Sequence, residues 1–88
     1  MTRYRRNPGV SETTIDGETF LVDPTDEDIF YLDQITTGLW RILATPHTKT
    51  EILTLFHAAF PQVDADRLDA DLTAALADLV ARSLVVTE

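Results

Sequence analysis

The sequence predicts an α+β domain with a winged-helix-like arrangement, in which an N-terminal three-stranded antiparallel sheet is followed by three helices. Residues 9–33 are rich in β-branched and aromatic side chains, and apolar residues recur with helical spacing through residues 34–88. A small meander is stable only with a packed face, so we expect the helices to cover one side of it. With 88 residues in the chain, we expect residues 9–88 to form a single domain.

Three short extended runs account for the predicted sheet. The runs Val10–Ile15 and Thr19–Asp23 flank the dipeptide Asp16-Gly17, and Asp-Gly between extended runs is a strong signal for a tight hairpin. The third run, Asp28–Leu32, mixes β-branched and aromatic side chains that suit a strand. In a meander the second strand is central, so the first and third are edges.

Capping residues mark where the three helices begin. The first helix is expected over Gln34–Ala44, with Asp33 as its N-cap. Thr48 and Glu51 have the spacing of a capping box and predict the start of the second helix, which ends at a proline. The third helix is expected over Ala65–Arg82, where leucines and alanines form one apolar stripe.

The two ends of the chain differ in character. Met1–Pro8 is polar and carries Arg3, Arg5 and Arg6, so we expect a flexible basic tail that lies outside the domain. Residues 84–86, Leu-Val-Val, are long enough for a short final strand.

Composition limits the partners and the compartment. The chain has 15 acidic and 7 basic residues, a net charge of −8, and no cysteine. Such a charge disfavours nucleic acid and anionic membrane surfaces as partners. No apolar run approaches the roughly 18 residues of a membrane span, and no signal peptide is recognisable. We therefore expect a cytoplasmic protein.

No residue pattern predicts an enzyme, a metal site or a cofactor. His47 and His57 lack a third ligand at metal-binding spacing, and no serine stands in a nucleophile-elbow context. A phosphopantetheine carrier is disfavoured because the nearest attachment-like sequence, around Ser83, closes a helix instead of opening one. Winged-helix DNA binding is disfavoured because the third helix and its cap are acidic. Its aspartates are Asp64, Asp66, Asp69, Asp71 and Asp78.

The third predicted strand is apolar on both faces. Ile29 and Tyr31 point to one face, and Phe30 and Leu32 to the other. Only one face can pack on the helices. Either the other face and the edge receive a peptide that adds as a fourth strand, or all four side chains are buried within the domain. The spacing alone favours neither alternative.

Several motifs in order resemble the PqqD-like proteins, which are also called RiPP recognition elements. The stretch Phe30–Leu43 resembles their strand ending in Leu-Asp and their helix containing Leu-Trp. Thr48–Phe60 and residues 71–85 are similar to their second helix, third helix and closing residues, and Asn7–Val10 is similar to a common opening. The sequence departs from the founding pyrroloquinoline-quinone members around Asp23–Glu27, and its stretch from Tyr31 to Trp40 resembles stand-alone members from lasso-peptide and related gene clusters more than those members.

This resemblance implies that the domain binds the leader region of a ribosomally made precursor peptide and presents it to a separate modifying enzyme, such as a protease, cyclase or radical enzyme. It implies antiparallel docking on the third strand, with apolar leader side chains entering a cleft against the third helix. The alternative is a general protein-interaction or self-associating module that uses the same edge. The implied site residues are Asp28, Ile29, Phe30, Tyr31, Leu32, Leu68, Asp71, Leu72, Ala75 and Leu79.

Overall fold

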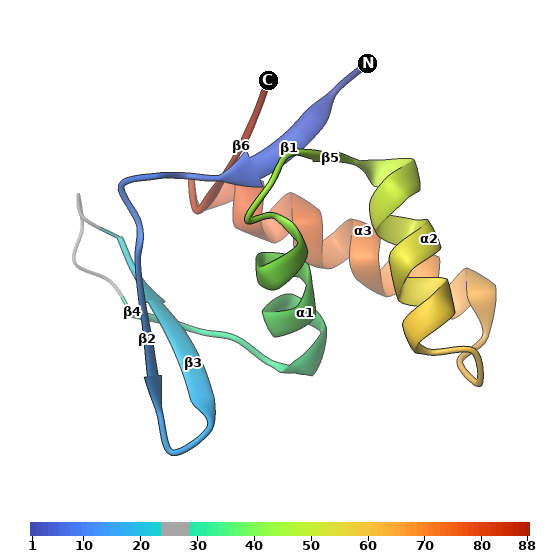
Figure 1. The fold of residues 1–88 in the computed structure, drawn as a ribbon, viewed down its shortest axis with the longest axis horizontal. Coiled ribbons are helices and arrows are strands. Elements are labelled where there is room, and N and C mark those ends of the chain that lie inside the picture. Colours follow the sequence, from blue (N-terminus) through green and yellow to red (C-terminus); the bar gives the residue numbers. More distant parts are fainter. Residues whose placement is uncertain (24–28) are drawn as a thin grey trace.

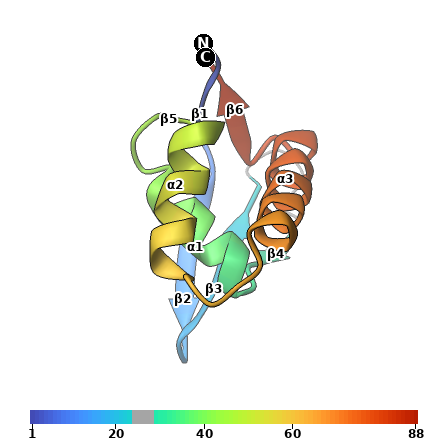
Figure 2. The same ribbon diagram turned by 90° about the vertical axis from the view of Figure 1, so that its right-hand side faces the viewer.

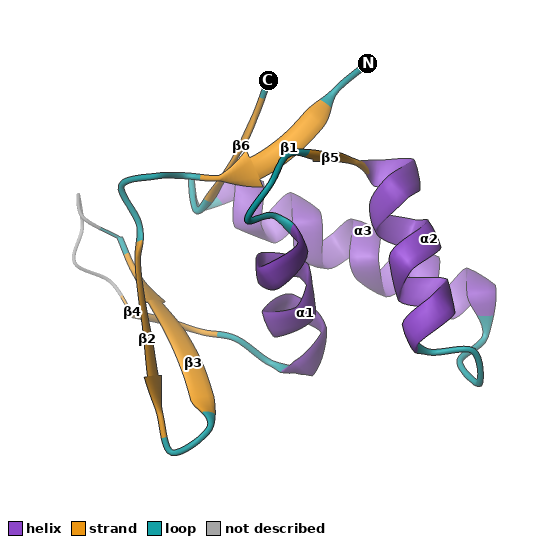
Figure 3. Cartoon of the chain, in the orientation of Figure 1, coloured by secondary structure: helices purple, strands orange, loops and turns teal. Residues whose placement is uncertain are grey.

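The computed structural model describes residues 1–23 and 29–88, and it contains two small sheets and three helices (Figure 1). Colouring by secondary structure shows the helices gathered on one side of the sheet β2-β3-β4, with the second sheet above them (Figure 3). The predicted α+β class, with an N-terminal three-stranded sheet followed by three helices, is confirmed.

The predicted meander forms one of the two sheets. Its strands are β2 (Ser11–Ile15), β3 (Glu18–Val22) and β4 (Ile29–Tyr31), paired antiparallel in the order β2-β3-β4. Asp16 and Gly17 connect β2 to β3 with φ angles of 53° and 82°. Two successive left-handed residues are what a tight two-residue hairpin turn requires, and this is why Asp-Gly occurs here.

The three helices lie close to their predicted positions. They are α1 (Gln34–Ile42), α2 (Lys49–Ala59) and α3 (Ala65–Ala81). Leucine side chains from all three helices meet Leu21 of β3 and Trp40 of α1 in a single core. No helix in the described residues is both long and apolar enough to cross a membrane.

Capping boxes begin the first two helices. The backbone N–H of Thr36 donates to Asp33 Oδ1 at 2.8 Å, and the backbone N–H of Asp33 donates to Thr36 Oγ1 at 2.9 Å. At α2 the N–H of Glu51 donates to Thr48 Oγ1 and the N–H of Thr48 donates to Glu51 Oε1. Each box satisfies backbone donors that the helix itself leaves unpaired. The box at Thr48 confirms the predicted start of α2.

The second sheet was not expected, and it corrects the prediction that residues 1–8 form a flexible tail. Residues Arg3–Arg6 form strand β1, which lies between β5 (His47–Thr48) and β6 (Val85–Thr87). Its partners are far away in the sequence, so the polar composition of the segment gives no local sign of the pairing. The predicted final strand does form, as β6.

Pairing of β1 with β6 brings the two ends of the chain together. The backbone N–H of Arg3 donates to the carbonyl of Glu88 at 3.3 Å, and that of Glu88 donates to the carbonyl of Arg3 at 2.9 Å. The turned view shows the N- and C-termini side by side, at the end of the molecule away from the β2–β3 hairpin (Figure 2).

Candidate functional site

One edge of strand β4 is open. Within the described residues, β4 pairs only with β3, and the N–H of Leu32 donates to the carbonyl of Thr19 at 3.0 Å. In an antiparallel ladder the residues that bond to one neighbour alternate with residues that face away from it. Phe30 and Leu32 therefore bond toward β3. The N–H and C=O groups of Ile29 and Tyr31 are directed to the open edge.

The side chains of β4 alternate in the same way. Phe30 and Leu32 are partly buried and pack against the core. Ile29 and Tyr31 are 54% and 68% exposed on the opposite face, where the Tyr31 ring lies 5.7 Å from the ring of Phe20. One face of β4 therefore packs on the helices and the other is exposed. This excludes the alternative in which all four side chains are buried within the domain, and it leaves a face that a peptide could cover.

A cleft of about 410 Å³ lies beside β4, and this volume is typical of ligand-binding pockets. Its floor and walls come from β4, the first turn of α1 and one face of α3. The α3 residues are spaced 3, 1 and 3 apart, so they follow one side of the helix. The lining residues are Phe30, Tyr31, Asp33, Ile35, Thr36, Asp71, Ala74, Ala75 and Asp78.

The polar groups of the cleft are acidic. Asp33 accepts hydrogen bonds from the backbone and hydroxyl of Thr36, and these bonds lower the pKa of its carboxyl, so it is charged at neutral pH. Asp78 accepts two 3.2 Å hydrogen bonds from Arg82 Nε, and the Arg82 guanidinium lies 4.8 Å from the centre of the Phe30 ring. No lysine or arginine is among the described residues that line the cleft.

The structure separates the predicted site residues into two groups. Asp71 and Ala75 line the cleft together with Phe30 and Tyr31. Asp28 lies outside the described residues. The remaining helix residues, Leu68, Leu72 and Leu79, are at most 2% exposed in the core and line no part of the cleft. The structure places these three leucines in the core, because α3 turns its leucine stripe away from the cleft, and their contact with a ligand stays a prediction.

Sequence reasoning missed about half of the cleft. On α3 each missed residue lies three residues after a predicted one, so a helical spacing from Asp71 would have found them. At the start of α1 the capping residues enter the cleft because the helix begins directly after the edge strand. The missed residues are Asp33, Ile35, Thr36, Ala74 and Asp78.

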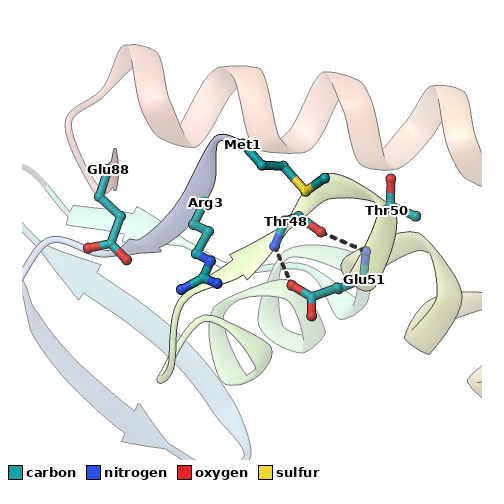
Figure 4. Close-up of a pocket in the computed structure, with 6 residues that line it drawn as sticks. All are labelled: Met1, Arg3, Thr48, Thr50, Glu51 and Glu88. Atoms are coloured by element: carbon teal, nitrogen blue, oxygen red, sulfur yellow. Dashed lines mark hydrogen bonds between the residues drawn. The ribbon is translucent and has the colours of Figure 1, made fainter.

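A second, more open pocket of about 750 Å³ lies at the other sheet, between β1, β5 and the start of α2 (Figure 4). Its charged groups are of both signs: Arg3 beside Glu51 and Glu88. Glu51 is engaged in the capping box with Thr48, and the backbone N–H of Thr48 that it binds lowers its pKa. The hydrogen bonds between Thr48 and Glu51 in this pocket therefore belong to the cap of α2. Within residues 1–23 and 29–88, no group of three His, Asp or Glu side chains is arranged to hold a metal ion.

Fold and site together define a winged-helix-like α+β domain with one open, apolar sheet edge beside a cleft. The chain belongs to the PqqD family, because the family model described as "Coenzyme PQQ synthesis protein D (PqqD)" matches residues 18–85. That match includes β3, β4 and all three helices. No curated protein sequence matches the chain.

Two solved structures have the same fold. The chain is similar to "TbiB1 in Complex with the TbiA(beta) Leader Peptide", with 25% identity, a TM-score of 0.79, and coverage of 92% of this chain and 93% of that one. It is also similar to "Lasso peptide synthetase B1 complexed with the leader peptide", with 18% identity and a TM-score of 0.74 over 94% and 96% of the two chains. The second likeness supports the fold alone.

Proposed function

We propose that this domain binds the leader region of a ribosomally made precursor peptide by strand addition to β4 and presents it to a separate modifying enzyme in the cytoplasm. The observation that carries the proposal is the open edge at Ile29 and Tyr31, beside a cleft of about 410 Å³. Membership of the PqqD family and likeness to TbiB1, solved with a leader peptide, support it.

The edge supplies both affinity and register for an added strand. An antiparallel peptide gains hydrogen bonds from the N–H and C=O groups of Ile29 and Tyr31, and its side chains alternate between the cleft and the exposed face. The domain contributes no chemical step in this proposal. It raises the concentration of the precursor near the enzyme, an effect that needs binding alone.

The substitution Tyr31→Pro tests the edge. It removes an N–H that faces the open edge and leaves the bonds from Phe30 and Leu32 to β3 in place, so the domain is expected to stay folded. The ligands are synthetic leader peptides, taken from small precursor genes beside the gene for this domain. Fluorescence anisotropy is expected to show binding that is at least about tenfold weaker, since a strand hydrogen bond and the docking geometry are both lost.

Glu12→Pro is the matched control. The register places Glu12 on the outer edge of β2, at the opposite side of the same sheet, where its N–H also faces away from β3. This variant is expected to bind the leader peptide within about twofold of the wild type. If Tyr31→Pro is folded by circular dichroism and binds as tightly as Glu12→Pro, the proposal fails.

Sedimentation distinguishes leader binding from self-association through the same edge. A self-associating module becomes larger with protein concentration in the absence of peptide, and Tyr31→Pro abolishes the effect. For a leader-binding domain we expect a monomer at micromolar concentration, and amide signals of Ile29 and Tyr31 that shift in NMR spectra only when the leader peptide is added.

A further inference from the structure

The cleft has an asymmetric charge distribution that bears on which peptide it accepts. Its α3 wall consists of Ala74 and Ala75 between two aspartates, Asp71 and Asp78. Seven residues separate the two aspartates, which corresponds to about 10 Å along the helix. The small alanine side chains leave room above the helix, and the carboxylates stand at the two ends of that room.

The two ends are not equivalent. Asp78 is paired with Arg82, and the Arg82 guanidinium also lies over the Phe30 ring, so the carboxylate at this end of the cleft already has a cationic partner. Asp71 is exposed at the other end, and within the described part of the chain it makes no hydrogen bond or ion pair. Asp33 lines the same cleft, and both of its bonds from Thr36 go to Oδ1, while the backbone N–H of Ile35 also helps to lower its pKa, so its carboxylate is charged and held in place.

Strand geometry determines which peptide side chains reach these groups. Residues that lie directly opposite each other in neighbouring strands have side chains on the same face of the sheet. A peptide residue beside Phe30 therefore turns its side chain toward α3. A residue beside Ile29 or Tyr31 turns its side chain to the exposed face. Only every second peptide side chain enters the cleft.

We propose that the cleft selects a peptide with a lysine or arginine at one of these inward positions, with Asp71 as the residue that determines this specificity. The inference rests on the proposed function, because it concerns the peptide that adds to β4. The aliphatic part of the side chain lies over Phe30 and Ala75, and the cationic end reaches Asp71 and the charged carboxylate of Asp33.

The chemistry of the cleft favours a cation over the alternatives. A peptide carboxylate would meet Asp33 and Asp71 with no positively charged group lining the cleft, and like charges at close range disfavour binding. A wholly apolar inward side chain beside Asp71 would displace part of the water around this carboxylate and offer it no partner. A cationic side chain with an apolar stem avoids both costs.

Selection from a random library tests the specificity without knowledge of the natural leader. Twelve-residue random peptides displayed on yeast are sorted on the wild-type domain, and the tightest peptide is synthesised with its selected lysine or arginine retained, or changed to Gln or to Glu. We expect lysine or arginine to be enriched at an inward position. The change to Gln should weaken binding about threefold to tenfold on the wild type, as for a partly desolvated ion pair.

Variants of the domain assign the effect to Asp71. On Asp71→Asn the Gln peptide is expected to bind as tightly as its parent, and on Asp71→Lys the Glu peptide is expected to bind more tightly than the parent. Asp69→Asn is the matched control: it removes the same charge from the same helix, but Asp69 lies outside the cleft, with its carboxylate accepting from the Thr73 hydroxyl at 3.4 Å. It should retain the preference of the wild type.

The outcomes distinguish the two proposals. In one outcome the selected peptides lose binding in Tyr31→Pro and yet show no enrichment of lysine or arginine, or show an enrichment that is unchanged in Asp71→Asn. Either result overturns the specificity inference and leaves strand addition standing. Failure to select any peptide, or selection of peptides that Tyr31→Pro binds equally well, overturns strand addition itself and the specificity inference with it.

Discussion

The two sheets of this domain use the same kind of backbone ladder in opposite ways. In the sheet β5-β1-β6, strand β1 is central and is paired on both sides. In the sheet β2-β3-β4, strand β4 is an edge that pairs only with β3 among the described residues. The first sheet thus closes the two ends of the chain against each other. The second leaves hydrogen-bonding groups facing outward, where another chain can use them.

The composition of the two strands follows this difference. Strand β1 reads Arg-Tyr-Arg-Arg, and side-chain contacts tie it to the helices: Arg6 Nε donates to the Trp40 carbonyl at 2.7 Å, and the Arg6 guanidinium lies 4.7 Å from the centre of the Trp40 ring. Strand β4 reads Ile-Phe-Tyr and is apolar on both faces. A strand paired on both sides tolerates polar residues, whereas apolar residues on both faces of an edge indicate that something further covers it.

Deletion of residues 1–8 is the strongest test of the closed sheet. Five backbone hydrogen bonds, donated by Arg3, Arg6, Asn7, Val10 and Glu88, are lost in addition to those of the strand ladder, at about 0.5–1.5 kcal/mol each. A total loss of roughly 4 kcal/mol or more is most of the stability of a small domain. We expect the deleted protein to be largely unfolded by circular dichroism, whereas deletion of Met1 and Thr2 alone changes the urea midpoint little. Equal midpoints for both deletions would mean that the segment is a free tail.

A second test compares two arginines of β1. Arg6→Ala loses the hydrogen bond to the Trp40 carbonyl and the contact with its ring, and we expect the free energy of unfolding to fall by about 2 kcal/mol. Arg5→Ala loses an ion pair with Glu88 at 3.5 Å that is about half exposed, for which we expect less than about 0.5 kcal/mol. Urea denaturation measures both. Similar losses for the two variants would contradict the assignment of Arg6 as the tie to the helices.

The open sheet depends on its hairpin turn, and Gly17→Ala tests this. A Cβ at Gly17 meets no atom within 4 Å, so the cost comes only from φ of +82°, at about 1 kcal/mol. Gly17→Asn should cost less, because asparagine tolerates the left-handed region. A thermal melt followed by circular dichroism compares the two variants. An alanine variant as stable as the wild type would show that the turn does not need this conformation.

The smallest expected effect is on the pH dependence of stability, and it concerns the capping carboxylates Asp33, after β4, and Glu51, after β5. Folding lowers the pKa of Asp33 and of Glu51, so the stabilisation is present above the unfolded values, near pH 4, and is lost as the pH falls through the folded values. Asp33→Asn, which still caps a helix, should flatten the decline of the urea midpoint between pH 5 and pH 2. Glu51→Gln should flatten it less, since Glu51 is fully exposed. A decline of unchanged slope in Asp33→Asn would contradict the assignment of this titration to the cap.

Local signals in the sequence predicted most of the fold. The Asp16-Gly17 turn, the capping box at Thr48 and the apolar stripe of α3 each depend on residues a few positions apart, and each was found where expected. The sheet β5-β1-β6 was missed because its pairs, such as Tyr4 with Thr87, join the two ends of the chain. Such pairing leaves no periodic trace in a four-residue polar strand.

The site was predicted at the level of the element and less well at the level of the residue. Alternation along β4 identified two faces, but only the register showed that Tyr31 and Ile29 face the open edge. On α3, spacing cannot separate the side that fills the core from the side that borders the cleft, because leucines and small residues share the helix. The structure assigns Leu72 to the core and Ala75 to the cleft.

The adjacency of the two termini has a practical consequence for how this domain can be attached to other molecules. Arg3 and Glu88 are bonded to each other in the sheet that does not contain β4. A linker fixed to either end, whether to a solid support, a fluorophore or another polypeptide, therefore emerges from the same corner and leaves strand β4 unobstructed. The same proximity makes the chain suitable for circular permutation, because a few residues are enough to join the old ends.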